Sequence, residues 1–189
     1  QGGTDTPQDP SMEKLTIPEG YTIDQIAKTI AKLKKNKLSS DTFLKKVQDD
    51  NFITQEATKY PNLLANLAKK ESGVKYRLEG YLFPATYNVT DSITAENLID
   101  QMLAAMDKTM SQYYDVLASK NLTVHDVLTI ASLVEKEGST DQDRKNIASV
   151  FYNRLNQNMP LQSNIAILYA QGKLGQKTTL DRKSTRLNS

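Results

Sequence analysis

The sequence predicts an α+β fold in which helices dominate and strands are short. Apolar residues recur at helical spacing in several segments, and most of these segments follow a good helix-capping residue. Strand-like patterns are confined to two stretches, near residues 14–17 and 78–89. The chain of 189 residues is long enough for one compact domain or two small ones. Its 38% of apolar residues supports a globular protein with a modest core.

The first elements follow a polar leader. Residues 1–13 are rich in Gly, Pro and polar side chains and are expected to be flexible. Residues 14–17 alternate as a short strand does, and residues 18–20 (Pro-Glu-Gly) signal a turn. Thr22 then begins a helix, because Gln25 completes a capping box and apolar residues follow at helical spacing.

Four lysines close this first unit. An anionic polymer could bind to these side chains, which are Lys32, Lys34, Lys35 and Lys37. The pattern favours the simpler interpretation, a solvated helix end where cations are favoured by the helix dipole. The sequence leaves both interpretations open.

The middle of the chain alternates between helices and one aromatic stretch. Ser40 is expected to cap a second helix, and Pro61 to begin a third. Residues 78–89 are aromatic and interrupted by Pro84, which predicts a strand bent at an edge or bulge. Thr94 should cap a long helix whose methionines, spaced by four residues, favour core packing over a ligand site.

The next predicted helix carries the residues of greatest chemical interest. Thr123, with Asp126 three positions later, should cap a helix that runs to Glu137 and stops at Gly138. The last residues, 177–189, show no periodicity and are predicted to be a non-native or disordered tail.

Composition excludes several kinds of function. The net charge of +2 gives no strong footprint for nucleic acid. The chain has no cysteine, hence no thiol nucleophile, and its lone histidine, His125, makes a multi-histidine zinc site impossible. We expect neither a metal nor a cofactor. No apolar run approaches the roughly 20 residues that span a bilayer.

Two carboxylates end the helix that Thr123 begins. Glu135 and Glu137 lie at the edge of its apolar face, where partial removal from water would raise a carboxyl pKa toward that of a general acid. On a helical wheel they point roughly 200° apart, so a paired dyad is not expected. A solvated Glu-Lys-Glu helix end explains the same pattern, and spacing alone does not choose between the two.

Five motifs, in order and at sensible spacing, resemble the MltG/YceG-like endolytic murein transglycosylases over about residues 14–176. These motifs are residues 17–22 (IPEGYT), 78–87 (LEGYLFPATY), 131–137 (ASLVEKE), 148–155 (ASVFYNRL), and 159–163 (MPLQS) followed by Tyr169-Ala170.

The resemblance implies a division of the chain. Residues 14–77 would form a small LysM-like subdomain, and residues 78–176 a mostly helical catalytic domain with a few strands, incomplete at its C-terminus. The parent protein would be held at the extracytoplasmic face of the bacterial cytoplasmic membrane by an anchor that this chain lacks. Its partners would be peptidoglycan glycan strands and, as candidates, cell-wall synthesis enzymes.

The resemblance also implies a reaction. Lytic transglycosylases cleave the MurNAc-GlcNAc bond without water, using one glutamic acid. Its proton goes to the departing oxygen, and the resulting carboxylate takes the proton of the muramic acid 6-hydroxyl as that oxygen attacks C1, leaving a 1,6-anhydro end. The motif places this residue at Glu137, with Glu135 as the alternative.

The other matched positions are implied to bind substrate. Glu79 could hydrogen-bond the sugar, or it could hold Glu137 in position without contacting the sugar. The remaining positions could line the cleft. The full set of expected binding residues is Glu79, Asn153, Arg154, Gln162, Ser163 and Tyr169. The chain departs from the family where Asn164-Ile165 replaces Asp-Pro, which puts any role of that position in doubt.

Two non-enzymatic alternatives stay open at this point. The chain could be a non-catalytic peptidoglycan-binding module, or an interaction domain of a cell-division assembly. Either alternative predicts that exchanging Glu137 for Gln has no catalytic consequence.

Overall fold

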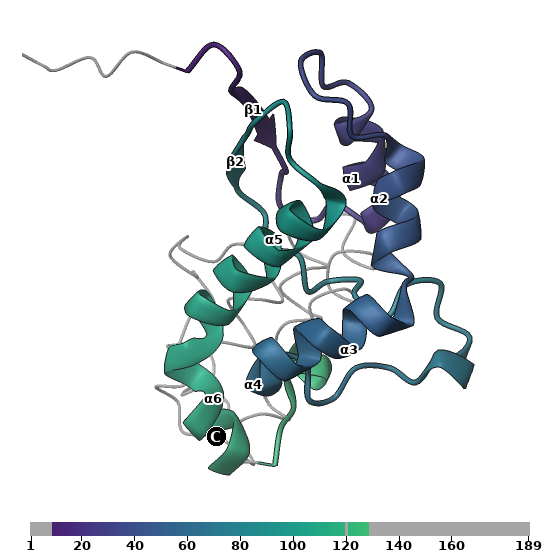
Figure 1. Ribbon diagram of the computed structural model, residues 1–189. Helices are drawn as coiled ribbons and strands as arrows, with labels where there is room; N and C mark the ends of the chain where they lie inside the picture. The colour runs from purple at the N-terminus through teal and green to yellow at the C-terminus, as the bar shows by residue number, and fades with distance from the viewer. Residues whose placement is uncertain (1–8, 120, 129–189) are drawn as a thin grey trace, which may run out of the picture.

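The computed structural model describes residues 9–119 and 121–128. These form a mixed α+β structure of several helices and one two-stranded sheet, as predicted, with the sheet near one end of the molecule (Figure 1). The elements, in chain order, are β1 Glu13–Thr16, α1 Ile23–Ile30, α2 Ser40–Val47, α3 Asp50–Lys59, α4 Pro61–Leu64, η1 Lys70–Ser72, β2 Thr86–Val89, α5 Ala95–Met110, η2 Ser111–Tyr113 and α6 Tyr114–Ser119. Residues 124–128 are also helical.

The sheet joins two distant parts of the chain. β1 pairs with β2 in antiparallel fashion, with Leu15 opposite Tyr87. The pairing continues beyond the strands, because the Ile17 N–H donates to the Ala85 carbonyl at 2.9 Å. The sheet therefore ties the segment predicted as residues 14–77 to the segment predicted to begin at 78, and that boundary stays a prediction.

Caps begin several helices where the sequence predicted them. Thr22 and Gln25 form the capping box of α1, and the Thr94 hydroxyl accepts from the Asn97 N–H of α5 at 3.2 Å. The cap of α2 is Ser39, not Ser40, because the Ser39 hydroxyl accepts the Thr42 N–H.

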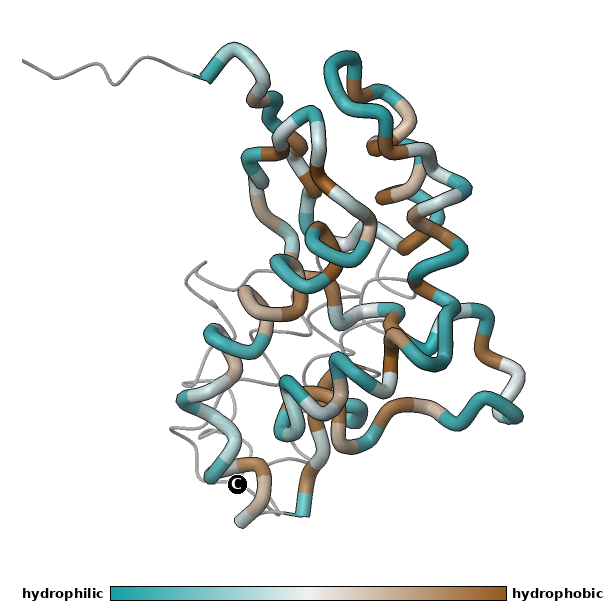
Figure 2. The backbone as a smooth tube through the Cα atoms, viewed as in Figure 1, coloured by the Kyte–Doolittle hydropathy of each residue, from teal (hydrophilic) through white to brown (hydrophobic). Residues whose placement is uncertain are grey.

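The long helix α5 is the centre of the core. Its methionines Met102, Met106 and Met110 are fully buried, which confirms their predicted packing role. They belong to one apolar cluster that also includes the buried faces of α1 and α2. Figure 2 shows hydrophobic and hydrophilic residues alternating along α3 and α5, as expected for helices with one buried face.

For the middle of the chain, one prediction was partly wrong and one helix was missed. Only residues 86–89 of the predicted bent strand are extended in a sheet, whereas residues 78–80 form a turn and residues 81–85 are irregular. The turn is closed by the hydrogen bond from the Tyr81 N–H to the Leu78 carbonyl, and Gly80 has a φ of +86°. Helix α3, which Asp49 caps, was not predicted from the sequence, because it has few apolar residues to reveal its period.

Candidate active site

The predicted catalytic residues Glu137 and Glu135 lie outside the described residues, as do five predicted binding residues. Those five are Asn153, Arg154, Gln162, Ser163 and Tyr169. The structure does describe Glu79 and the start of the helix that Thr123 begins. Glu79 is the one predicted site residue that is described, and Thr123 begins the helix that is predicted to carry Glu135 and Glu137.

The helix start has the capping box that the sequence predicted. The Thr123 N–H donates to the Asp126 carboxylate at 2.9 Å, and the Asp126 N–H donates to the Thr123 hydroxyl at 3.0 Å. The Val127 N–H then donates to the Thr123 carbonyl at 3.2 Å. These bonds fix the direction in which the helix leaves residue 123.

Glu79 lies in the turn that follows Leu78 and reaches across to helix α1. Its Oε2 accepts a hydrogen bond from the Ile23 N–H at 2.9 Å, and its Oε1 lies 3.3 Å from the same nitrogen. A carboxylate is well placed there, because the first N–H groups of a helix have no partner within the helix and carry partial positive charge. In the described structure Glu79 thus supports the backbone of α1, and its expected contact with sugar stays a prediction.

Gly80 brings this turn against the helix that begins at Thr123. Its φ of +86° lies in the left-handed region that side chains disfavour. A Cβ placed on Gly80 would lie 3.7 Å from the Cβ of Leu128, which is ordinary contact. The turn conformation is therefore the reason for glycine, and the turn lies beside Leu128.

Tyr81 extends this contact into the core. Its side chain is 1% exposed, and its hydroxyl has no hydrogen-bond partner among the residues that the structure describes. Burial, followed by the negative charge of Asp126, raises the pKa of Tyr81. The phenol therefore stays neutral and able to donate a hydrogen bond.

A second polar cluster, which was not predicted from the sequence, connects α3 to α5. Glu56 is 7% exposed, and its Oε2 has no partner among the described residues. Burial, followed by the neighbouring Asp100, raises the pKa of Glu56 to about 7. Asp100 itself accepts from Lys59 Nζ at 2.8 Å and from the Tyr60 hydroxyl at 2.9 Å. Glu56 lies on the same buried face of α3 as Phe52 and Ile53. This spacing would have indicated that Glu56 is buried if the helix had been predicted.

Neither a metal-binding cluster nor a membrane-spanning helix occurs in the described part of the chain. Residues 9–119 and 121–128 contain no group of three or more His, Cys, Asp or Glu side chains that could hold a metal ion. Within the same ranges, no helix combines the length and the apolar character needed to cross a bilayer.

Comparison with known proteins places these features in context. The chain is 64% identical over 183 residues to the endolytic murein transglycosylase of Streptococcus pneumoniae serotype 2 (strain D39), covering 95% of this chain and 33% of that protein. It is 39% identical over 161 residues to the endolytic murein transglycosylase of Bacillus subtilis (strain 168), covering 85% of this chain and 44% of the relative. The chain thus spans about a third to under half of the length of these relatives.

A solved structure and a family model agree with these relatives. The crystal structure of a yceG-like protein from Listeria monocytogenes superposes with a TM-score of 0.62 at 42% identity, covering 88% of this chain and 54% of that one. The sequence model of the YceG-like family matches residues 4–189. Because this match covers nearly the whole chain, the protein belongs to the YceG-like family.

Proposed function

We propose that this chain is part of an endolytic peptidoglycan lytic transglycosylase. The observation that carries the proposal is the 64% identity, over 95% of the chain, to a relative named endolytic murein transglycosylase. The parent protein would act on glycan strands at the extracytoplasmic face of the bacterial membrane, with cell-wall synthesis enzymes as candidate partners.

The proposed mechanism uses Glu137 as acid and then as base. Glu137 gives its proton to the oxygen that leaves C1 of the muramic acid, and then takes the proton of that sugar's 6-hydroxyl as the hydroxyl oxygen bonds to C1. No water enters and the glutamic acid is regenerated, so one carboxyl group suffices, unlike the two that hydrolysing glycosidases need. Glu135 is the alternative acid.

The described structure supports this proposal at the base of the helix. The Thr123 capping box fixes the first turn of the helix on which Glu135 and Glu137 are predicted to lie. The turn at Gly80 then packs against Leu128 in the second turn. A catalytic acid needs a rigid support, since small errors of placement cost large factors in rate.

The proposal includes a LysM-like unit near the N-terminus. The unit is predicted over residues 14–77, and the strand–helix–helix order of β1, α1 and α2 supports it. Helices α3 and α4 and the short helix η1 also lie between β1 and its antiparallel partner β2, which comes after residue 77.

Product analysis tests the reaction and the acid together. Uncrosslinked glycan strands are digested with this chain, with Glu137→Gln and with Glu135→Gln, and the ends are identified by mass spectrometry. We expect 1,6-anhydro ends that disappear with Glu137→Gln and persist with Glu135→Gln.

Three results would change the proposal. Loss only with Glu135→Gln would keep the reaction and move the acid to Glu135. Reducing ends, which contain an added water, would overturn the one-carboxyl mechanism. Strand binding by the folded chain without any cleavage would favour the non-catalytic binding module.

A further inference from the structure

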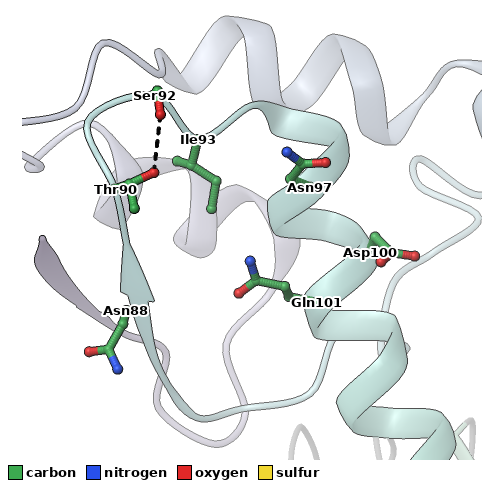
Figure 3. Close-up of a pocket in the computed structure, with 7 residues that line it drawn as sticks. All are labelled: Asn88, Thr90, Ser92, Ile93, Asn97, Asp100 and Gln101. Atoms are coloured by element: carbon green, nitrogen blue, oxygen red, sulfur yellow. Dashed lines mark hydrogen bonds between the residues drawn. The ribbon is translucent and has the colours of Figure 1, made fainter.

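A small polar cavity lies between strand β2 and helix α5, apart from the turn that contains Glu79 (Figure 3). It has a volume of about 280 Å³, just below the roughly 300 Å³ at which pockets for drug-sized ligands begin, so it can hold only a small group. Only one of its lining side chains, Ile93, is apolar. The polar residues that line it are Asn88, Thr90, Ser92, Asn97, Asp100 and Gln101.

The chemistry of these side chains restricts the ligand. Three carboxamides supply donors and acceptors without charge, and two hydroxyls can act either way. Asp100 brings the one formal charge, and it already accepts from Lys59 and from the Tyr60 hydroxyl. Such a lining does not favour phosphate, a metal ion or a hydrophobic molecule. It suits a neutral molecule with many hydrogen-bonding groups.

The carboxamides are available to such a ligand. Among the described residues, the side-chain amides of Asn88, Asn97 and Gln101 make no hydrogen bond. In Figure 3 the Gln101 side chain extends from α5 toward β2, whereas the Asn88 side chain points away from α5.

The wall opposite Gln101 is held in place before any ligand arrives. The Thr90 carbonyl accepts from the Asn36 side chain and, at 3.3 Å, from the Ile93 N–H. The Thr90 and Ser92 hydroxyls lie 3.4 Å apart (Figure 3). Thr94, which follows Ile93, is itself held by its capping hydrogen bond at the start of α5. A wall built in this way loses little freedom on binding, which favours affinity for a small ligand.

We propose that this cavity is a saccharide subsite that takes one N-acetylated sugar residue of a glycan strand. The carboxamides match the donor and acceptor of an acetamido group, and the hydroxyls match sugar hydroxyls. The identification of the ligand as part of a glycan rests on the proposed function. The subsite would contribute to binding of the strand.

Titration by nuclear magnetic resonance tests the subsite directly. The ¹⁵N-labelled chain is titrated with the tetramer of N-acetylglucosamine, with maltotetraose beside it as a sugar that lacks acetamido groups. We expect saturable shifts of the Asn97 and Gln101 side-chain amides and of the Thr90 backbone. Gln101→Ala should weaken this binding by about tenfold, the factor that corresponds to one good hydrogen bond.

Two variants decide whether the sugar binds at this cavity. Gln101 is exposed on α5 and alanine favours helices, so the fold should survive Gln101→Ala. Gln112→Ala, an exposed amide on η2, is the matched control and should bind as the parent does. Equal binding of maltotetraose, or binding that Gln101→Ala leaves unchanged, would overturn the proposal. Cleavage is measured separately by product analysis, so the subsite and the catalytic proposal can each fail alone.

Discussion

Replacing Glu56 by glutamine should make the protein more stable at alkaline pH and change little at acid pH. The Glu56 carboxyl is buried beside Asp100, and its pKa rises from 4.5 to about 7. Glutamine has the same shape, carries no charge and can donate a hydrogen bond to Asp100, as the protonated acid does. The variant therefore keeps the protonated arrangement at every pH.

The direction in which stability changes with pH follows from proton binding. Between about pH 4.5 and 7, folded Glu56 holds a proton that the unfolded chain releases. The free energy of unfolding of the parent therefore falls as the pH rises through this window, and levels off above it. Glu56→Gln removes this fall, so the stability difference between variant and parent should grow with pH.

The size of this change in stability follows from the raised pKa of Glu56. A difference of one pH unit in pKa is worth about 1.4 kcal/mol, so the shift corresponds to about 3 kcal/mol when Glu56 is fully ionised. Between pH 5 and pH 8 the parent should lose about 2 kcal/mol relative to the variant, since titration is incomplete at both ends. That loss is a large fraction of the 5–15 kcal/mol that typically stabilises a domain.

Urea unfolding followed by circular dichroism measures this difference. Parent, Glu56→Gln and the control Glu71→Gln, an exposed residue of η1, are compared from pH 5 to pH 8.5. The control should track the parent within about 0.5 kcal/mol. A difference between Glu56→Gln and parent that stays constant with pH, or a variant less stable than the parent at pH 8, would refute the argument.

Further predictions concern the turn and the core. Glu79→Ala should lower the free energy of unfolding by about 1 kcal/mol, because the Ile23 N–H loses its partner, and thermal unfolding measures the loss. Gly80→Ala and Gly73→Ala should each lower the free energy of unfolding by about 1–2 kcal/mol, because both glycines have a positive φ and neither has a neighbour closer than ordinary contact. A far larger loss of stability for Gly80→Ala alone would show a tighter contact with the helix beside it. Met102→Ala should cost about 2–5 kcal/mol in urea unfolding because the side chain is fully buried, and a loss below 1 kcal/mol would contradict its place in the core.

The sequence predicted those features that depend on neighbouring residues. The capping pairs at Thr22 and Thr123 were visible because a cap and its partner lie three positions apart. The buried methionines of α5 were visible because their spacing marks one face of a helix. Local chemistry decides each of these features, so no knowledge of the tertiary structure was needed.

Features that depend on distant parts of the chain escaped prediction. The pairing of β1 with β2 and the bond from Ile23 to Glu79 each join residues far apart in the sequence. The environment of Glu56 depends on where α5 places Asp100, which no periodicity in α3 reveals. In the candidate site, the support given by Glu79 is described, whereas the roles of Glu137 and Glu135 stay predictions.

The β1–β2 pairing also dictates an order of events during synthesis. Thr16 and Thr86, whose hydroxyls lie 3.0 Å apart across the sheet, are separated by 70 residues along the chain. During synthesis β1 stays unpaired until β2 has been made, and Leu15 and Ile17, which are buried in the folded structure, are exposed to solvent until then. Closing so long a loop is slow compared with forming the helices between its ends. The nascent chain therefore passes through an interval in which α1 and α2 can form while β1 remains an unpaired strand edge, open to chaperones and to misassembly.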